Sequence, residues 1–460
     1  MRINFISGRR GGVATVAAAA LLAVACRGSV TDTTLRVITP TVIDPGVLNN
    51  ADGANALRTG ALARLRNVAG GSESSWLFGG LVADEWQTSS TFIQNDEADE
   101  RKISLDNASV TFQFRTIQQV RTASNQAIAS LKTYRPTAST DIAEMYFARG
   151  FAELQLAQDF CNGIPLSDAS VSPIVYGKPQ TIDAVFRVAM ASLDTAITLS
   201  GTGADAQSVL VNRAARVARA RAQLGINDIA GAATTVAAVP STFTYDMTYA
   251  LSSGDNILWA QPFSSNRYSL GDTVVVTGAG TFITKPSINF ASAADPRVPA
   301  QNPGKRAQDG SVFVKTTSLW AQTTSVSVFN GIDARLIEAE AFLKAGNTTS
   351  WLATLNLLRT QPPIPLGAIT VTAMAPLADP GDAASRLALT FREKAFWTFG
   401  RGQRLSDMRR LLRQYGLAEA NVFPSGTHYR GVPYGTDKNL PVPTDELNNP
   451  NFTGCLDRNP

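Results

Sequence analysis

The 460-residue chain carries 41 lysine and arginine residues, 37 acidic residues and one histidine. This mixed, nearly balanced charge gives no global electrostatic case for nucleic acid or another polyanion as a partner. The single histidine, His428, excludes multi-histidine metal sites and most histidine-dependent catalysis.

The first 25 residues predict a secretory signal that is removed. Arg2, Arg9 and Arg10 form a positive start, and the apolar, alanine-rich run at 12–25 is too short to span a bilayer. The run ends in Leu-Ala-Val-Ala before Cys26, which resembles the lipobox of bacterial lipoproteins and predicts a lipid on that cysteine. A plain signal peptide with a cysteine nearby by chance is the alternative.

Cleavage before Cys26 leaves 435 residues with 38 basic and 37 acidic side chains. That length is more than one core usually fills, so two lobes or an extended solenoid are expected. Residues 26–46 form a polar tether. Further along, apolar residues recur every three or four positions, the spacing of amphipathic helices, in pairs that favour stacked helix-turn-helix units. Helices are predicted at 50–68, from 76 onwards, and at 106–131, 139–160, 182–199, 209–224, 226–239, 331–345, 349–360 and 386–416.

Two segments lack this periodicity. The later part of 76–100, which ends in the run Asn-Asp-Glu-Ala-Asp-Glu, predicts a solvated acidic loop, because its acids lack calcium-loop spacing. Residues 240–330 are dense in Pro, Gly, Ser and Thr and predict loops with small strands at 273–277 and 311–315. The chain therefore divides into a helical part at 47–239, this loop-rich part at 240–330, and a C-terminal helical part at 331–460 that packs on the first.

The segment 386–416 holds seven arginines and Lys394 against two acids, which invites a nucleic-acid interpretation. The balanced total charge instead favours arginines that support the fold by pairing with carboxylates of neighbouring helices. We expect Glu338 to meet one of them, and its neighbour Glu340 to point elsewhere, because residues two apart on a helix face different directions. The residues expected to form such pairs are Arg392, Arg404, Asp407 and Arg409 or Arg410.

Two cysteines remain once Cys26 carries a lipid. An envelope or extracellular compartment permits disulfides, so Cys161 and Cys455 are predicted to form a bridge that ties the C-terminal tail to the first half. Two buried free thiols are the alternative.

Four segments, in order over nearly the whole mature chain, resemble the SusD/RagB family of outer-membrane nutrient-binding lipoproteins. They are DIAEMYFARGFAELQL at 141–156 with its Gly-Ile-Pro-Leu exit, ARLIEAEAFLKAGN at 334–347, FREKAFWTFGRGQRLSDMRR at 391–410 and NLPVPTDELNNPNF at 439–452. Phe399 stands where the family has an acid, and Gly402-Gln403 is similar to a local insertion, so the helix is expected to kink there.

The resemblance implies a mainly α, SusD-like fold with tetratricopeptide-like helix pairs and a loop-rich lobe with minor strands. It also implies a non-catalytic, lipid-anchored protein of the outer membrane, without cofactor, metal or nucleic acid, that captures oligosaccharide or peptide-like nutrients for a TonB-dependent SusC-like transporter. An outward-facing position is expected, although the residues after Cys26 lack the acid-rich export signal of many relatives. A tetratricopeptide-like scaffold that binds protein partners is the alternative.

Sugar sites combine aromatic faces with amides and charged groups. Two stretches offer that combination, one after Asp84-Glu85 and one in the loop-rich part, with packing in the core as the alternative for each aromatic. Trp86 and Trp320 are the favoured platforms. The residues predicted to bind ligand are Trp86, Thr88, Phe92, Asn95, Trp259, Arg267, Tyr268 and Trp320, with Gln94, Phe263 and Asn266 beside them.

Overall fold

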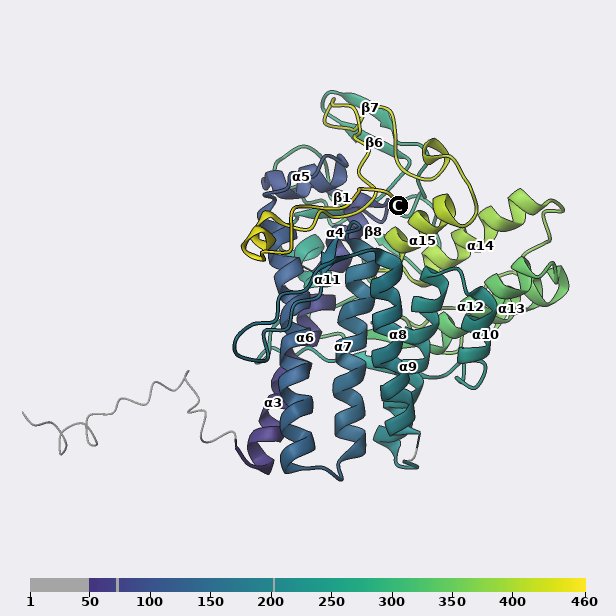
Figure 1. Cartoon of the computed structure of the whole chain (residues 1–460). Coiled ribbons are helices and arrows are strands. Elements are labelled where there is room, and N and C mark those ends of the chain that lie inside the picture. Colours follow the sequence, from purple (N-terminus) through teal and green to yellow (C-terminus); the bar gives the residue numbers. More distant parts are fainter. Residues whose placement is uncertain (1–48, 72–73, 202) are drawn as a thin grey trace, which may run out of the picture. The chain divides into compact units, whose positions relative to one another are not determined.

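Five long helices stand side by side and form the main layer of the protein (Figure 1). They are α3 (Ala51–Gly70), α6 (Ala108–Tyr134), α7 (Ser139–Asp159), α8 (Ile182–Ser200) and α9 (Ala206–Gly225), and each packs on the next in this order. The central helix, α7, is buried on nearly all sides. Gly150 permits its close contact with α8, because a Cβ there would lie 2.6 Å from Leu193 Cγ.

This computed structural model describes residues 49–460 apart from 72–73 and 202. The predicted signal peptide, Cys26 and the whole tether lie outside the described residues. Asn49–Pro460 forms one compact unit, so the three parts expected from the sequence are segments of one body, and their boundaries remain a proposal. Within the described part, no helix is long and apolar enough to cross a membrane.

The helix pairs continue beyond α9. The next helices are α10 (Ile229–Val236), α12 (Gly331–Lys344) and α13 (Thr348–Thr360), of which α10 packs on α9 and α12, and α12 on α13. Polar side chains cap the starts of several helices. At α6, Asn107 accepts from the Val110 amide at 3.1 Å, and at α12, Asn330 and Asp333 form a reciprocal capping box. The mainly α fold of paired helices is confirmed.

Among the described residues, short strands pair only two at a time, and all of these strand pairs are antiparallel. The strand predicted at 273–277 is confirmed as β6, but 311–315 forms no strand, since Phe313 makes only an isolated bridge with Arg306. The pairs are β1 (Trp86–Thr88) with β5 (Tyr268–Leu270), β2 (Ile164–Pro165) with β3 (Pro179–Gln180), β4 (Thr244–Met247) with β10 (Val326–Asn330), β6 (Val274–Thr277) with β7 (Gly280–Ile283), and β8 (Ala300–Gln301) with β9 (Thr316–Thr317).

The solvated acidic loop predicted in the later part of 76–100 is wrong. After α4 (Ser75–Val82) the chain forms β1 and then a helix, α5 (Ile93–Asp99), at one end of the long helices (Figure 1). Asp96 and Asp99 are buried because they accept hydrogen bonds from the Thr88 hydroxyl at 2.9 Å and the Thr88 amide at 2.7 Å. Asp96 and Asp99 of this run therefore hold β1 in place through their hydrogen bonds to Thr88.

The segment 386–416 is two helices rather than one kinked helix, α14 (Ala383–Trp397) and α15 (Arg404–Arg413). Gly400 and Gly402 between them both have φ of +66°, a conformation that favours glycine. A Cβ on Gly402 would lie 2.1 Å from Trp76 Cδ1, so this turn packs directly on α4.

Lys394 of α14 and Arg410 of α15 are buried and paired with carboxylates, but the carboxylate of α12 that they share is Glu340 rather than Glu338. Lys394 Nζ lies 2.8 Å from Glu340 Oε2, and Arg410 donates to both Glu340 oxygens. Glu338 pairs instead with Arg335 on its own helix at 2.9 Å. Burial alone would raise the pKa of Glu340, but Arg410 and Lys394 hold it below the ordinary value.

The other expected pairs divide into two groups. Arg404 binds both oxygens of Asp84, at 2.7 and 2.9 Å, and Asp407 meets Lys394 at 2.9 Å. Arg409 instead donates to backbone carbonyls at the end of α7, and Arg392 lies over the Phe396 ring at 4.6 Å. These last two contacts replace the carboxylates that the sequence suggested.

A disulfide joins Cys161, just after α7, to Cys455 in the C-terminal tail. Their Cα atoms lie 6.1 Å apart, and the Cys161 amide also donates to the Leu440 carbonyl at 2.9 Å. The tail is thereby fixed to the end of α7, near the 3₁₀ turn η4 (Thr444–Asn448).

Candidate functional site

The β1–β5 pair brings two distant stretches of sequence together. Thr88 lies opposite Tyr268, which places residues 89–92 beside Arg267. The Ser89 backbone amide donates to the Arg267 carbonyl at 2.9 Å, and the Gln308 backbone amide donates to the Ser89 carbonyl at 3.0 Å. Residues 305–314 form a hairpin-like loop whose tip therefore covers this junction.

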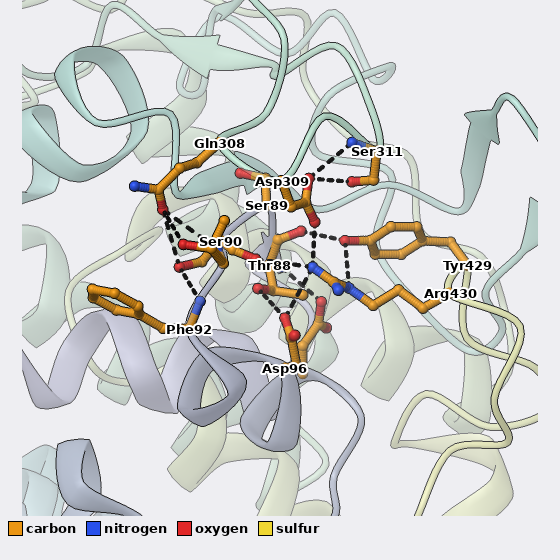
Figure 2. Close-up of polar contacts among 12 residues, drawn as sticks. Thr88, Ser89, Ser90, Phe92, Asp96, Gln308, Asp309, Ser311, Tyr429 and Arg430 are labelled. Carbon is orange, nitrogen blue, oxygen red and sulfur yellow. Dashed lines mark hydrogen bonds and ion pairs between the residues drawn. The ribbon is translucent and has the colours of Figure 1, made fainter.

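An exposed aromatic ring and an arginine meet at the junction. Phe92 is 38% exposed, and the Arg267 guanidinium lies 4.1 Å from its ring centroid. Arg267 Nε donates to Gln308 Oε1 at 3.1 Å, and the Thr91 hydroxyl reaches the same oxygen at 3.3 Å. Figure 2 shows Gln308 lying above Phe92, with its amide nitrogen turned away from these contacts.

Two stacked aromatic rings lie on the segment that leads into β5. Trp259 of α11 (Ile257–Trp259) stacks on Phe263 of the π turn η2 (Ala260–Ser264), with ring centroids 5.5 Å apart. The four-residue spacing puts both rings on one side of the turn. Phe263 is 36% exposed, and Lys305 Nζ lies 4.8 Å from its centroid and 3.3 Å from its carbonyl.

These side chains define the aromatic–cation surface, which lies over a partly buried ionic floor. Arg430 contacts Asp96 at 3.0 Å and also binds Asp309, and the Tyr429 hydroxyl donates to the Thr88 carbonyl at 2.5 Å (Figure 2). Burial raises the pKa of Asp96 to about 6, against the opposing effect of Arg430. The floor fixes the position of β1 and of the 305–314 loop. The aromatic–cation surface comprises Phe92, Trp259, Phe263, Arg267, Lys305 and Gln308.

The two favoured platforms do not belong to this surface. Trp86 is 1% exposed and Trp320 is 5% exposed. The two rings pack against each other and against Phe399 in the core, with Tyr268 at the edge of Trp86. A sugar ring has no open face of these tryptophans to stack on, so packing in the core, the alternative for each aromatic, describes them.

The remaining predicted residues divide in the same way. Phe92, Trp259 and Arg267 reach the surface, with Phe263 beside them. Thr88 and Asn95 are buried, and they support β1 and α5 without being accessible to a ligand.

Five surface and floor residues were missed from the sequence, and Lys305, Gln308 and Arg430 make the most contacts there; the other two are Asp309 and Tyr429. The one signal for the first two is the Asp309-Gly310 pair, a dipeptide typical of tight hairpins. Arg430 had no signal, because its role depends on carboxylates far away in the sequence.

Two cavities of ligand size lie elsewhere in the described part. One, of about 350 Å³, is bordered by Phe313 on the far side of the 305–314 loop and by Val274 and Val276 of β6. The other, of about 380 Å³, lies between α14, α15 and residues 286–289. The first has the exposed ring of Phe313 and the amides of Gln87 and Asn302 in its lining, whereas the aromatic residue of the second, Phe391, is buried. Among the residues that the structure describes, no cluster of three or more His, Cys, Asp or Glu side chains is suited to hold a metal ion.

Comparison with known proteins identifies the fold. No protein-family model matches the sequence, and no curated protein matches it. Among solved structures, a SusD-like carbohydrate binding protein from Bacteroides fragilis is 12% identical with a TM-score of 0.63, covering 88% of this chain and 99% of that one. A SusD superfamily protein from Bacteroides vulgatus and a laminarin binding SusD-like protein are each 16% identical with TM-scores of 0.58, covering 89% of this chain and 99% of theirs. The chain therefore has the SusD-like fold, as its four sequence segments predicted.

Proposed function

We propose that this protein, with its SusD-like fold, is a non-catalytic lipoprotein of the outer membrane that captures nutrient oligosaccharide. A peptide-like nutrient is the other substrate that the resemblance allows. The protein delivers its ligand to a TonB-dependent SusC-like transporter, and lipid on Cys26 holds it to the membrane facing outward. Two of the solved structures that share its fold are named for binding carbohydrate, one of them laminarin.

The observation that carries this proposal is the aromatic–cation surface. Phe92, at the start of α5, and Phe263, in η2, are both exposed, and each lies beside groups that can hydrogen-bond a sugar hydroxyl. Within the described part, the side-chain nitrogen of Gln308, Nε2, has no partner, so it is a donor free for a ligand. Aromatic rings with amides at their edges suit carbohydrate, which has apolar faces and polar edges.

The test is a binding survey of the mature domain against soluble polysaccharides by calorimetry or affinity electrophoresis. We expect saturable binding to at least one glycan, and we expect Phe92→Ala to weaken it by about 1 kcal/mol, roughly fivefold. Tyr134→Ala is the matched control, because Tyr134 is 37% exposed at the far end of α6. Absence of binding to every glycan, or equal losses in both variants, would contradict the proposal.

The scaffold alternative predicts a different outcome. A tetratricopeptide-like scaffold would co-purify with protein partners, bind no glycan, and be insensitive to Phe92→Ala. The proposal instead predicts co-purification with a TonB-dependent barrel and no release of reducing ends when the pure protein is incubated with the glycan that it binds. Reproducible hydrolysis would make the protein an enzyme and overturn the ranking.

A further inference from the structure

The exposed rings of this region each carry a cation. Arg267 lies 4.1 Å from the Phe92 centroid, and Lys305 lies 4.8 Å from that of Phe263. On the same loop, Arg306 lies 5.0 Å from the centroid of Phe313, which is also exposed. A ligand that approaches these rings therefore meets positive charge as well as apolar surface.

These three cations are not neutralised by the protein. In the part of the chain that the structure describes, no carboxylate lies within ion-pair distance of Arg267, Lys305 or Arg306. Their hydrogen bonds go to the Gln308 side chain and to the carbonyls of Phe263 and Gly310. The charge stays available because a neutral oxygen cannot cancel it.

The nearest acids are occupied. Asp96 and Asp309 both bind Arg430 in the floor beneath the surface, and Asp309 also accepts from Ser311. Asp255, near Trp259, accepts from Gln322 at 3.0 Å. The local charge is thus positive although the sequence as a whole is nearly balanced, which is why composition alone gave no sign of it.

Neutral sugars stack best on an open ring face. Here one face of Phe92 is taken by a guanidinium, and Phe263 is stacked on Trp259 with an ammonium nearby. Cations with an adjacent amide donor are instead the groups that hydrogen-bond carboxylate and sulfate strongly. Arg267 and Lys305 can each bind such a group, and the side-chain nitrogen of Gln308 adds a neutral donor on the same loop as Lys305.

We propose that the aromatic–cation surface selects anionic polysaccharides, whose sugars carry carboxylate or sulfate groups. This inference rests on the proposed glycan-binding function and specifies its substrate class. The shared chemistry is an anionic group on a sugar ring, and separate arms of the experiment distinguish carboxylate from sulfate.

The experiment compares glycans that differ only in charge. Polygalacturonate oligosaccharides are measured against the same oligosaccharides after methyl esterification, and a sulfated galactan against its desulfated form. We expect at least one charged member to bind about tenfold more tightly than its neutral counterpart at low salt, with the preference shrinking as ionic strength rises.

Protein variants assign the preference to the surface. Arg267→Gln/Lys305→Gln is expected to abolish the preference between charged and neutral members. Arg64→Gln/Lys132→Gln is the matched control, since it also removes two exposed cations that bind only neutral groups, the Gln119 amide and the Tyr146 hydroxyl, and should keep the preference.

Each outcome decides between the two proposals. Equal binding of both members of each pair, or binding of laminarin alone, would overturn the anionic selection while leaving the glycan-binding function in place. Failure to bind any glycan would overturn both. A preference that survives in the Arg267→Gln/Lys305→Gln variant would remove the surface from the explanation.

Discussion

Cationic side chains have opposite surroundings in two regions of this protein. Between α12, α14 and α15, Lys394 and Arg410 are buried and share Glu340. On the aromatic–cation surface, Arg267 and Lys305 lie over aromatic rings and, within the described residues, contact no carboxylate. The difference teaches that the partner of a cation, rather than its residue type, separates a group that holds the fold from one that is free to bind a ligand.

Removing the carboxylate that the buried cations share should have the largest effect on stability. Glu340→Gln leaves Lys394 and Arg410 buried with one carboxylate fewer, and we expect the free energy of unfolding to fall by about 3–5 kcal/mol. Urea unfolding measures it. Glu338→Gln is the control on the same helix, because its more exposed pair with Arg335 should cost less than about 1 kcal/mol. Similar losses in both variants would show that the buried network has no special weight.

Glu85 extends the comparison to a buried carboxylate that forms no ion pair within the described residues. Glu85 accepts from the Gly400 amide at 2.9 Å, and burial, the largest cause, raises its pKa from 4.5 to about 8. Between these two values the folded state keeps a proton that the unfolded state has lost, so the free energy of unfolding falls as the pH rises. At about 1.4 kcal/mol per pKa unit, the loss between pH 5 and pH 9 is on the order of 4 kcal/mol.

Glu85→Gln tests this expectation, because an amide has nearly the same shape and cannot ionise. Melting temperatures recorded from pH 5 to pH 9 should fall less steeply for the variant than for the unaltered protein, because burial also raises the pKa values of Asp96 and Asp159 and these groups keep part of the pH dependence in both. Parallel curves for the two proteins would mean that another group causes the pH dependence.

The sequence predicts the helices of this fold well and its loop-rich part poorly, for a physical reason. Helix signals are local, since apolar spacing and caps lie within a few residues of one another. The strand β1 exists because Trp86 pairs with Leu270, far along the chain. No local pattern records such a pairing, so the later part of 76–100 was predicted to be a loop when it forms a strand and a helix.

The candidate site shows the same limit. Composition identified Phe92, Trp259 and Arg267 as aromatic and polar groups suited to sugar, but the same criterion selected Trp86 and Trp320, which the fold buries. Exposure depends on which elements cover a ring, and that is decided by tertiary packing. Likewise the 305–314 loop joined the site only through contacts made across the fold.

Removing one surface cation should have the smallest effect on stability and a clear effect on binding. Arg267→Ala loses an exposed contact with Phe92 and a hydrogen bond to Gln308, so we expect less than about 1 kcal/mol of unfolding free energy to be lost. Affinity for the glycan should fall by about 1–2 kcal/mol, because a charge-assisted hydrogen bond to the ligand disappears. Arg64→Ala, which removes an exposed arginine of α3, should change neither quantity. A loss of stability in Arg267→Ala as large as in Glu340→Gln would place Arg267 with the cations that hold the fold, and the distinction between the two regions would fail.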